Sequence, residues 1–252
     1  LNQLFKILDT MMAAHISANA VSTVAYLSQI NMAISALGGG LAVGASIKIS
    51  EAYGEGNFEL VKRRVSTLFA LCGLLGMAIL AILIPVAPQF LRLANTPEEF
   101  IEEGTVYFIL ELVSLVIIFF NNVYIAIERA RGNSKRILNL NMMVIGIKLS
   151  LTAFFVYVLK GGINDISIAT IVSQLALLGV AVFYMNAKEN VFGFSWKAIS
   201  FRKSVVAPMI KLSVPVIVEK MAFSLGKVVV NSMSTVYGTL TVGALGKIGR
   251  AS

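Results

Sequence analysis

The chain has 252 residues, of which 57% are hydrophobic and 13% are charged, with a single cysteine and a single histidine. Soluble domains carry about 25% charged residues, so this composition excludes an ordinary soluble protein and indicates a polytopic membrane protein. The formal net charge of +8 could indicate nucleic-acid binding, but the basic residues are spread among loops, which argues against that partner.

Seven helical spans are predicted, because the uncharged or nearly uncharged runs are close to the roughly 20 residues that cross a bilayer as a helix. The first span is a remnant that ends near Ile16. The others cover residues 21–53, 65–91, 96–127, 137–159, 166–187 and 208–236. The sequence begins and ends within predicted helices, so we expect it to be a piece of a longer protein. The predicted fold class is an all-α polytopic membrane protein.

Small residues and prolines shape the second and third spans. Residues 21–53 are too long for a straight crossing, so this helix is expected to tilt or to extend into the cytoplasm. Ala36, Gly40 and Gly44 recur at four-residue spacing, which allows membrane helices to approach closely. In the next span, Pro85 and Pro88 are expected to bend or end the helix.

The fourth span and the long connection after the sixth have clear local signatures. Thr96 suits the N-cap, Pro97 suits the first helical position, and the following glutamates favour the positive end of the helix dipole. Residues 191–207 mix aromatic and cationic side chains, as a linker on the membrane surface would.

Basic residues predict the orientation of the spans. The loops after the second, fourth and sixth spans hold most of them: Lys62, Arg63, Arg64, Arg129, Arg131, Lys135, Arg136, Lys188, Lys197, Arg202 and Lys203. The loops after the first, third and fifth spans hold only Arg92 and Lys160. By the positive-inside rule, the first group of loops is cytoplasmic.

Polar residues within the spans are the candidate site residues, because a charge buried at membrane depth is costly and therefore points to function. Asp9 lies about 12 Å below the predicted external turn, and Lys148 lies at the middle of the fifth span. Polar stripes at helical spacing comprise Lys220, Ser224, Lys227 and Asn231 on the seventh span, and Glu111, Ser114 and Asn121 or Asn122 on the fourth. Such stripes imply a shared hydrated cavity.

A purely structural role is the alternative for these charges. Asp9 could pair with Lys6, and Glu219 could pair with a lysine of its own helix, as static packing charges. Cys72 is expected to be a small buried hydrophobe. His15 has no partners at ligand spacing, so no metal site is predicted. The sequence has no phosphate-binding loop, G-x-S-x-G motif or dinucleotide fingerprint, and we expect neither an enzyme nor ATP-driven transport by this chain.

Five segments resemble the multidrug and toxic compound extrusion (MATE) family in the family's order. FKILDTMMAAHISANAVSTVAY resembles its first-helix signature, an apolar run, Asp-Thr, a second apolar run and a small-residue turn. SEAYGEGNFELVKRR and IERARGNSKR resemble two of its loops. INDISIATIVSQL resembles its sixth-helix start, and LSVPVIVEKMAF resembles the opening of its second half. The resemblance implies two pseudo-symmetric six-helix lobes around a central cavity, and export of organic compounds by Na⁺ or H⁺ antiport through alternating access.

The resemblance also implies a division of the chain and roles for its residues. Residues 1–190 would form the first lobe, 191–207 the interfacial linker, and 208–252 the seventh helix and the beginning of the eighth. Asp9 matches the family's first-helix acidic residue, the expected ion-coupling group, with Na⁺ or H⁺ as the coupling ion and no other cofactor. The expected cavity residues are Glu111, Asn121, Asn122, Lys148, Thr152, Glu219, Lys220, Ser224, Lys227 and Asn231.

Three positions depart from the family pattern and leave the function open. Lys148 and Thr152 stand where some members carry Asn and Asp, and Phe223 stands where an acidic residue is often found. An ion-coupled antiporter of drug-like compounds is one interpretation. A flippase for anionic lipid-linked precursors is another, because a cationic cavity would bind phosphate. A scaffold or truncated pseudo-transporter is the third. The expected setting is a monomer in the bilayer of a bacterial or archaeal plasma membrane, with a small-molecule substrate.

Overall fold

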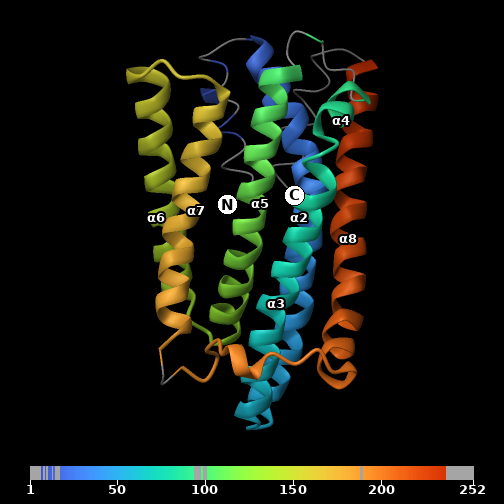
Figure 1. Cartoon of the computed structure of the whole chain (residues 1–252), viewed down its shortest axis with the longest axis vertical. Helices are drawn as coiled ribbons and strands as arrows, with labels where there is room; N and C mark the ends of the chain where they lie inside the picture. Colours follow the sequence, from blue (N-terminus) through green and yellow to red (C-terminus); the bar gives the residue numbers. More distant parts are fainter. Residues whose placement is uncertain are drawn as a thin grey trace.

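The computed structural model describes Ile7, Asp9, Met11, Met12, Ala14, residues 18–93, Glu98, residues 101–187 and residues 190–236. In this part the chain is a bundle of long helices that run up and down along one direction (Figure 1). Its elements are α2 (Ala18–Gly54), α3 (Phe58–Leu83), α4 (Ala87–Leu93), α5 (Ile101–Ala130), α6 (Ser134–Ala153) with the π-helical turn η2 (Phe154–Val158), α7 (Ile163–Met185), the 3-10 turn η3 (Trp196–Ala198) and α8 (Lys203–Val236).

Five helices of the described chain are long and apolar enough to cross a membrane: Ile30–Gly54, Phe58–Leu83, Ile101–Ala130, Ser134–Val158 and Ile163–Met185. Many large apolar side chains on the outside are exposed, among them Met77, Ile82 and Phe183, as lipid-facing residues are. The predicted all-α polytopic membrane fold is therefore confirmed. The remnant of the first span is described only at its scattered residues, and the predicted eighth helix, Thr96 and His15 lie outside the described residues.

The third predicted span is divided into two helices. α3 ends at Leu83, a turn that contains Pro85 follows, and α4 begins at Ala87. This break agrees with the expected effect of the prolines. The start of α3 differs from the prediction, because the helix begins at Phe58 and not near Val65. The side chain of Asn57 caps it, accepting a hydrogen bond from the backbone N–H of Leu60 at 3.2 Å, so the basic residues belong to the helix.

Two Gly-Asn pairs build two turns at the same end of the bundle. Gly56 and Gly132 both have φ of +74°, a left-handed conformation that favours glycine after a helix end. Asn133 caps α6 by accepting from the backbone N–H of Arg136 at 3.4 Å, as Asn57 caps α3. The linker before α8 lies at this end as well (Figure 1). The three loops predicted to be cytoplasmic thus share one end of the bundle.

Close contact between α2 and α8 explains the small residues of the second span. A Cβ added at Gly44 would overlap the backbone of Ser213, and one added at Gly40 would overlap Ile217. The Ser213 hydroxyl also donates to the backbone carbonyl of Leu41 at 3.3 Å. The predicted close approach through Gly40 and Gly44 is confirmed. α8 begins at Lys203, earlier than the predicted Pro208, which lies inside the helix.

The linker is held against α3 by two buried hydroxyl groups. Ser66 Oγ accepts a hydrogen bond from the backbone N–H of Ser195, and Thr67 Oγ accepts one from the backbone N–H of Ser200, both at 3.0 Å. Phe192 is buried in the core, whereas Trp196 is 81% exposed. Nearby, the buried carboxylate of Glu128 accepts from Arg131 at 3.2 Å, which ties the end of α5 to the following turn.

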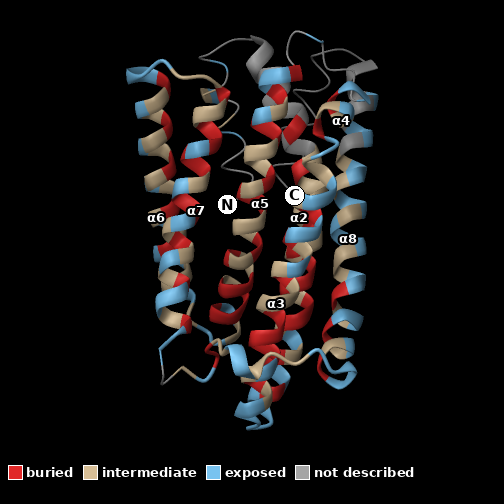
Figure 2. Ribbon diagram, in the orientation of Figure 1, coloured by how far each residue is buried: buried red, intermediate tan, exposed pale blue. Residues whose placement is uncertain are grey.

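Buried residues occur along α5 and α7 and on the lower halves of α2 and α3 (Figure 2). α6 lies at one side of the bundle (Figure 1), and its buried residues form one stripe at four-residue spacing: Leu140, Val144, Lys148 and Thr152. This stripe turns Lys148 toward the neighbouring helices and away from lipid. The two apolar clusters of the core meet along α5, between Phe119 and Val123.

Candidate functional site

A cavity of about 640 Å³ lies between α2, α5 and α8 and reaches side chains of the first helix, α6 and α7. Its ionisable lining residues are Asp9, Glu111, Arg129, Lys148, Glu219 and Lys220. On α5 it extends from Glu111 to Arg129, which is about 27 Å at a rise of 1.5 Å per residue. The cavity therefore joins a buried group of charges to the end of the bundle that is predicted to be cytoplasmic.

A buried ion pair lies at the deep end of this cavity. Lys148 Nζ donates to Asp9 Oδ2 at 2.8 Å, and the two side chains are 3% and 14% exposed. The pair connects the first helix to the buried stripe of α6, across 139 residues of sequence. Lys6, the alternative partner considered for Asp9, lies outside the described residues.

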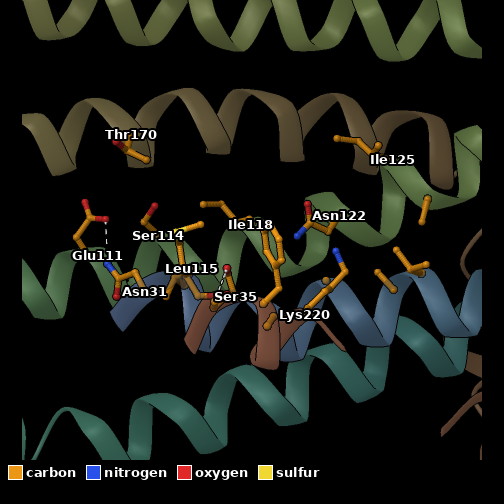
Figure 3. A pocket seen from close by; sticks show the side chains of 18 of the residues that line it. Asn31, Ser35, Glu111, Ser114, Leu115, Ile118, Asn122, Ile125, Thr170 and Lys220 are labelled. Carbon is orange, nitrogen blue, oxygen red and sulfur yellow. Dashed lines mark hydrogen bonds between the residues drawn. The ribbon is translucent and has the colours of Figure 1, made fainter. Parts of the chain in front are cut away.

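Glu111 is held beside this pair by two neutral groups from other helices. Its Oε1 accepts from the hydroxyl of Ser167 on α7 at 2.7 Å, and its Oε2 accepts from the side-chain amide of Asn31 on α2 at 3.3 Å (Figure 3). Asp9 and Lys148 both interact electrostatically with Glu111. The structure thus gathers two carboxylates and one ammonium group within the bundle.

The two asparagines of α5 have different surroundings. Asn122 lines the cavity (Figure 3), as the polar stripe on this helix predicts for one of the two. Asn121 points instead toward α7, where its amide donates to the side-chain and backbone oxygens of Gln174 at 2.8 and 2.9 Å. Thr152 is 2% exposed and is also absent from the cavity lining. Asn121 therefore joins α5 to α7, and Thr152 is a buried residue outside the cavity lining.

The polar stripe of α8 divides after its first turn. Lys220 and Ser224 line the cavity together with Glu219 and Phe223. Lys227 is not a lining residue, and its ammonium group lies over the Phe223 ring at 4.6 Å from the centroid. The side chain of Asn231 lies outside the described residues. Lys148 and Lys220 thus reach the same cavity as Asp9, whereas Lys227 is one turn removed from it.

Neutral polar residues of the site escaped sequence analysis. Asn31 and Ser35 on α2 line the cavity, as does Thr170 on α7 (Figure 3), and Ser167 binds Glu111. These residues lie inside apolar runs and carry no charge, so a search for ionisable groups passes over them. Their spacing by three and four residues was the available signal, because it places each pair on one helical face.

Membrane-length helices arranged around an internal polar cavity define an α-helical polytopic membrane protein. A sequence model of the MatE family matches residues 1–154. The chain belongs to the MatE family, and the resemblance of its motifs is confirmed.

Three known proteins illustrate the relationship. The probable multidrug resistance protein YoeA of Bacillus subtilis (strain 168) is 25% identical over 220 residues, which cover 84% of this chain and 48% of that protein. An inward-facing multidrug resistance MATE family transporter of the MOP superfamily has a TM-score of 0.85 at 21% identity, covering 96% of this chain and 55% of that one. A MOP superfamily transporter from Pyrococcus furiosus, described as having a binding pocket of reverse polarity, has a TM-score of 0.88 at 21% identity, covering 99% and 56%. The chain thus spans about half the length of these relatives.

Proposed function

We propose that the intact protein is a secondary transporter that exports organic or drug-like compounds in exchange for Na⁺ or H⁺. The buried Asp9–Lys148 pair beside Glu111, at the end of a cavity between membrane-length helices, carries this proposal. Ionisable groups at membrane depth are costly and mark ion or substrate pathways. A cavity of about 640 Å³ has the size of a site for a small organic molecule.

Alternating access would follow from two lobes that move against each other around this cavity. Residues 1–190 would belong to the first lobe, and residues 208–252 would open the second. The family membership and the names of the relatives support this arrangement. The setting we propose is a monomer in the plasma membrane of a bacterium or archaeon, with the bilayer as its surroundings.

The test is ion-driven transport by the Asp9→Asn variant of the intact protein in proteoliposomes, with ethidium as the transported probe. We expect the variant to insert into the membrane and to lose ethidium transport driven by an imposed Na⁺ or H⁺ gradient, because the first-helix charge is gone. Glu102→Gln is the matched control, since Glu102 is an exposed carboxylate near the start of α5. Undiminished transport by Asp9→Asn would contradict a role of the buried charges in ion-coupled export.

A flippase for anionic lipid-linked precursors is the second candidate. It is favoured by Arg129 and Lys220, which line the cavity and form no ion pair with another described residue. A guanidinium and an ammonium group would both bind phosphate. Translocation of a fluorescent polyprenyl-phosphate lipid in the same proteoliposomes, without transport of ethidium, would select this function over drug export.

A further inference from the structure

We propose that the coupling ion is a proton carried by Glu111 on α5, while Asp9 and Lys148 remain a permanently ionised pair. This inference rests on the proposed function of ion-coupled transport. It assigns to Glu111 the role that the first-helix carboxylate would otherwise have, and it selects H⁺ over Na⁺.

The first step is that the Asp9 charge already has a counter-charge. Lys148 Nζ lies 2.8 Å from Asp9 Oδ2, and the lysine side chain is 3% exposed. Protonating Asp9 would leave a buried ammonium group without its carboxylate, which is costly at low dielectric. The pair is therefore poorly suited to gain and lose a proton in each cycle.

The second step is that Glu111 has neutral partners that fit both of its protonation states. Ser167 Oγ lies 2.7 Å from one carboxylate oxygen and Asn31 Nδ2 lies 3.3 Å from the other. A hydroxyl can donate or accept, and an amide presents either its N–H or its oxygen after rotation. Asn31 is 7% exposed and lines the cavity, and its Oδ1 has no hydrogen-bond partner among the described residues. That oxygen can accept the proton of a neutral Glu111 carboxyl group.

The third step is the charge of the surroundings. The groups that face Glu111 are Asp9 of the first helix, Asn31 of α2, Tyr107 of its own helix, Lys148 of α6 and Ser167 of α7. α8 adds Glu219 and Lys220 to the same cavity. Because the Asp9 and Lys148 charges cancel, the described deep group keeps one negative charge, on Glu111. A single proton neutralises it.

The selection of H⁺ follows from the position of the ammonium group. A sodium ion beside Asp9 would be repelled by Lys148, which already occupies that side of the carboxylate. A proton needs only the carboxyl oxygen. On release, the O–H bond of Glu111 breaks, its electron pair stays on oxygen, and the proton passes to water in the cavity.

The transport experiment uses the intact protein in proteoliposomes with ethidium. A pH gradient should drive ethidium accumulation, whereas a Na⁺ gradient at equal pH should not. Glu111→Gln should lose the pH-driven accumulation, because its amide cannot gain and release a proton in this pH range. Glu102→Gln is the matched control. Full accumulation driven by Na⁺ alone, or by a pH gradient in Glu111→Gln, would overturn the proposal.

A rescue separates Glu111 from Asp9 as the proton carrier. In Asp9→Asn, the Lys148 ammonium group loses this carboxylate and can attract Glu111 and hold it ionised, so coupling is lost. Adding Lys148→Met should restore pH-driven transport, because the ammonium group beside Glu111 is gone. If Asp9 itself carries the proton, the double variant stays inactive, which would refute the proposal.

Infrared difference spectroscopy reads the proton without any transport. The detergent-purified intact protein should show a high-frequency carboxylic-acid carbonyl band that disappears at alkaline pH. This band should be absent in Glu111→Gln and present in the Asp9→Asn/Lys148→Met double variant, and Ser167→Ala should change its midpoint pH. Its persistence in Glu111→Gln would refute the proposal. The infrared band tests the protonation of Glu111 whether or not ethidium is transported. Absence of ethidium transport would count against the proposed export function and not against the protonation of Glu111.

Discussion

The Lys148→Met variant removes the ammonium group of the buried pair and keeps a side chain of similar length. Lys148 Nζ lies 2.8 Å from Asp9 Oδ2, so the Coulomb attraction is about 6 kcal/mol at an effective dielectric constant of about 20. The desolvation of both ions offsets much of this attraction. The pair as a whole therefore contributes little, but removing one partner takes the opposite charge at 2.8 Å away from the other buried charge.

We expect Lys148→Met to lower the free energy of unfolding by about 3 to 5 kcal/mol, the usual cost of breaking a buried pair from one side. Asp9→Asn should cost a similar amount, because the lysine then loses its carboxylate. The double variant should lie within about 1 kcal/mol of the wild type, since no charge is left unpaired. The pair is therefore identified by single-variant losses of unfolding free energy that do not add in the double variant.

The assay is unfolding of the intact protein in mixed micelles titrated with SDS and followed by circular dichroism. Lys211→Met is the matched control, because Lys211 is an exposed lysine on α8. Its stability should equal that of the wild type. A Lys148→Met variant as stable as the wild type, or a double variant that loses the sum of the two single effects, would refute the reasoning.

Three further predictions test the packing, the orientation and the cavity. Gly44→Ala should destabilise the protein by about 1 to 3 kcal/mol in the same assay, because the added Cβ overlaps the Ser213 backbone. Gly146→Ala is the control and should not destabilise it, because a Cβ there meets open space. Equal effects of the two variants would contradict the close packing of α2 against α8. The orientation is tested with single cysteines in protein that lacks Cys72. Cysteines at Asn57 and Asn133 should react with impermeant thiol reagents only from the cytoplasm, and one at Asn95 only from outside. The opposite labelling pattern would contradict the predicted orientation. A cysteine at Asn122 should react with a small hydrophilic thiol reagent, whereas one at Asn121, which is 1% exposed and bonded to Gln174, should not; similar reactivity of the two would dispute the cavity lining.

Helix order and membrane character could be predicted from hydropathy, but helix ends could not. Arg64 illustrates the reason. A search for uncharged runs places this residue in a loop, yet it is 9% exposed within α3 and donates to the backbone carbonyl of Lys48. The true start of α3 is set by the Asn57 cap, a local hydrogen bond that hydropathy does not register. Similarly, Pro208 marks no helix start, because α8 begins five residues earlier at Lys203.

The charged members of the site could be found from sequence, but their pairing could not. Asp9, Glu111 and Lys148 stand out because each interrupts an apolar run. The partners in the Lys148–Asp9, Asn31–Glu111 and Ser167–Glu111 contacts are 139, 80 and 56 residues apart in the sequence. These contacts depend on how five helices are rotated about their axes. The short-range pairing of Asp9 with Lys6 was a natural expectation because helical spacing shows only neighbours on the same helix.

Lys148 changes what the neighbouring carboxylates can do. Two carboxylates alone in an apolar bundle would repel each other, and either could be neutralised by a proton or a metal cation. With an ammonium group 2.8 Å from Asp9, the charge of one carboxylate is balanced, and Glu111 has a hydroxyl and an amide as its hydrogen-bond partners among the described residues. Lys148 is itself the departure from the family pattern. Its charge is also the reason for proposing Glu111, and not Asp9, as the proton carrier. We expect a relative that carries Asn at the position of Lys148 to lack this counter-charge beside its first-helix carboxylate.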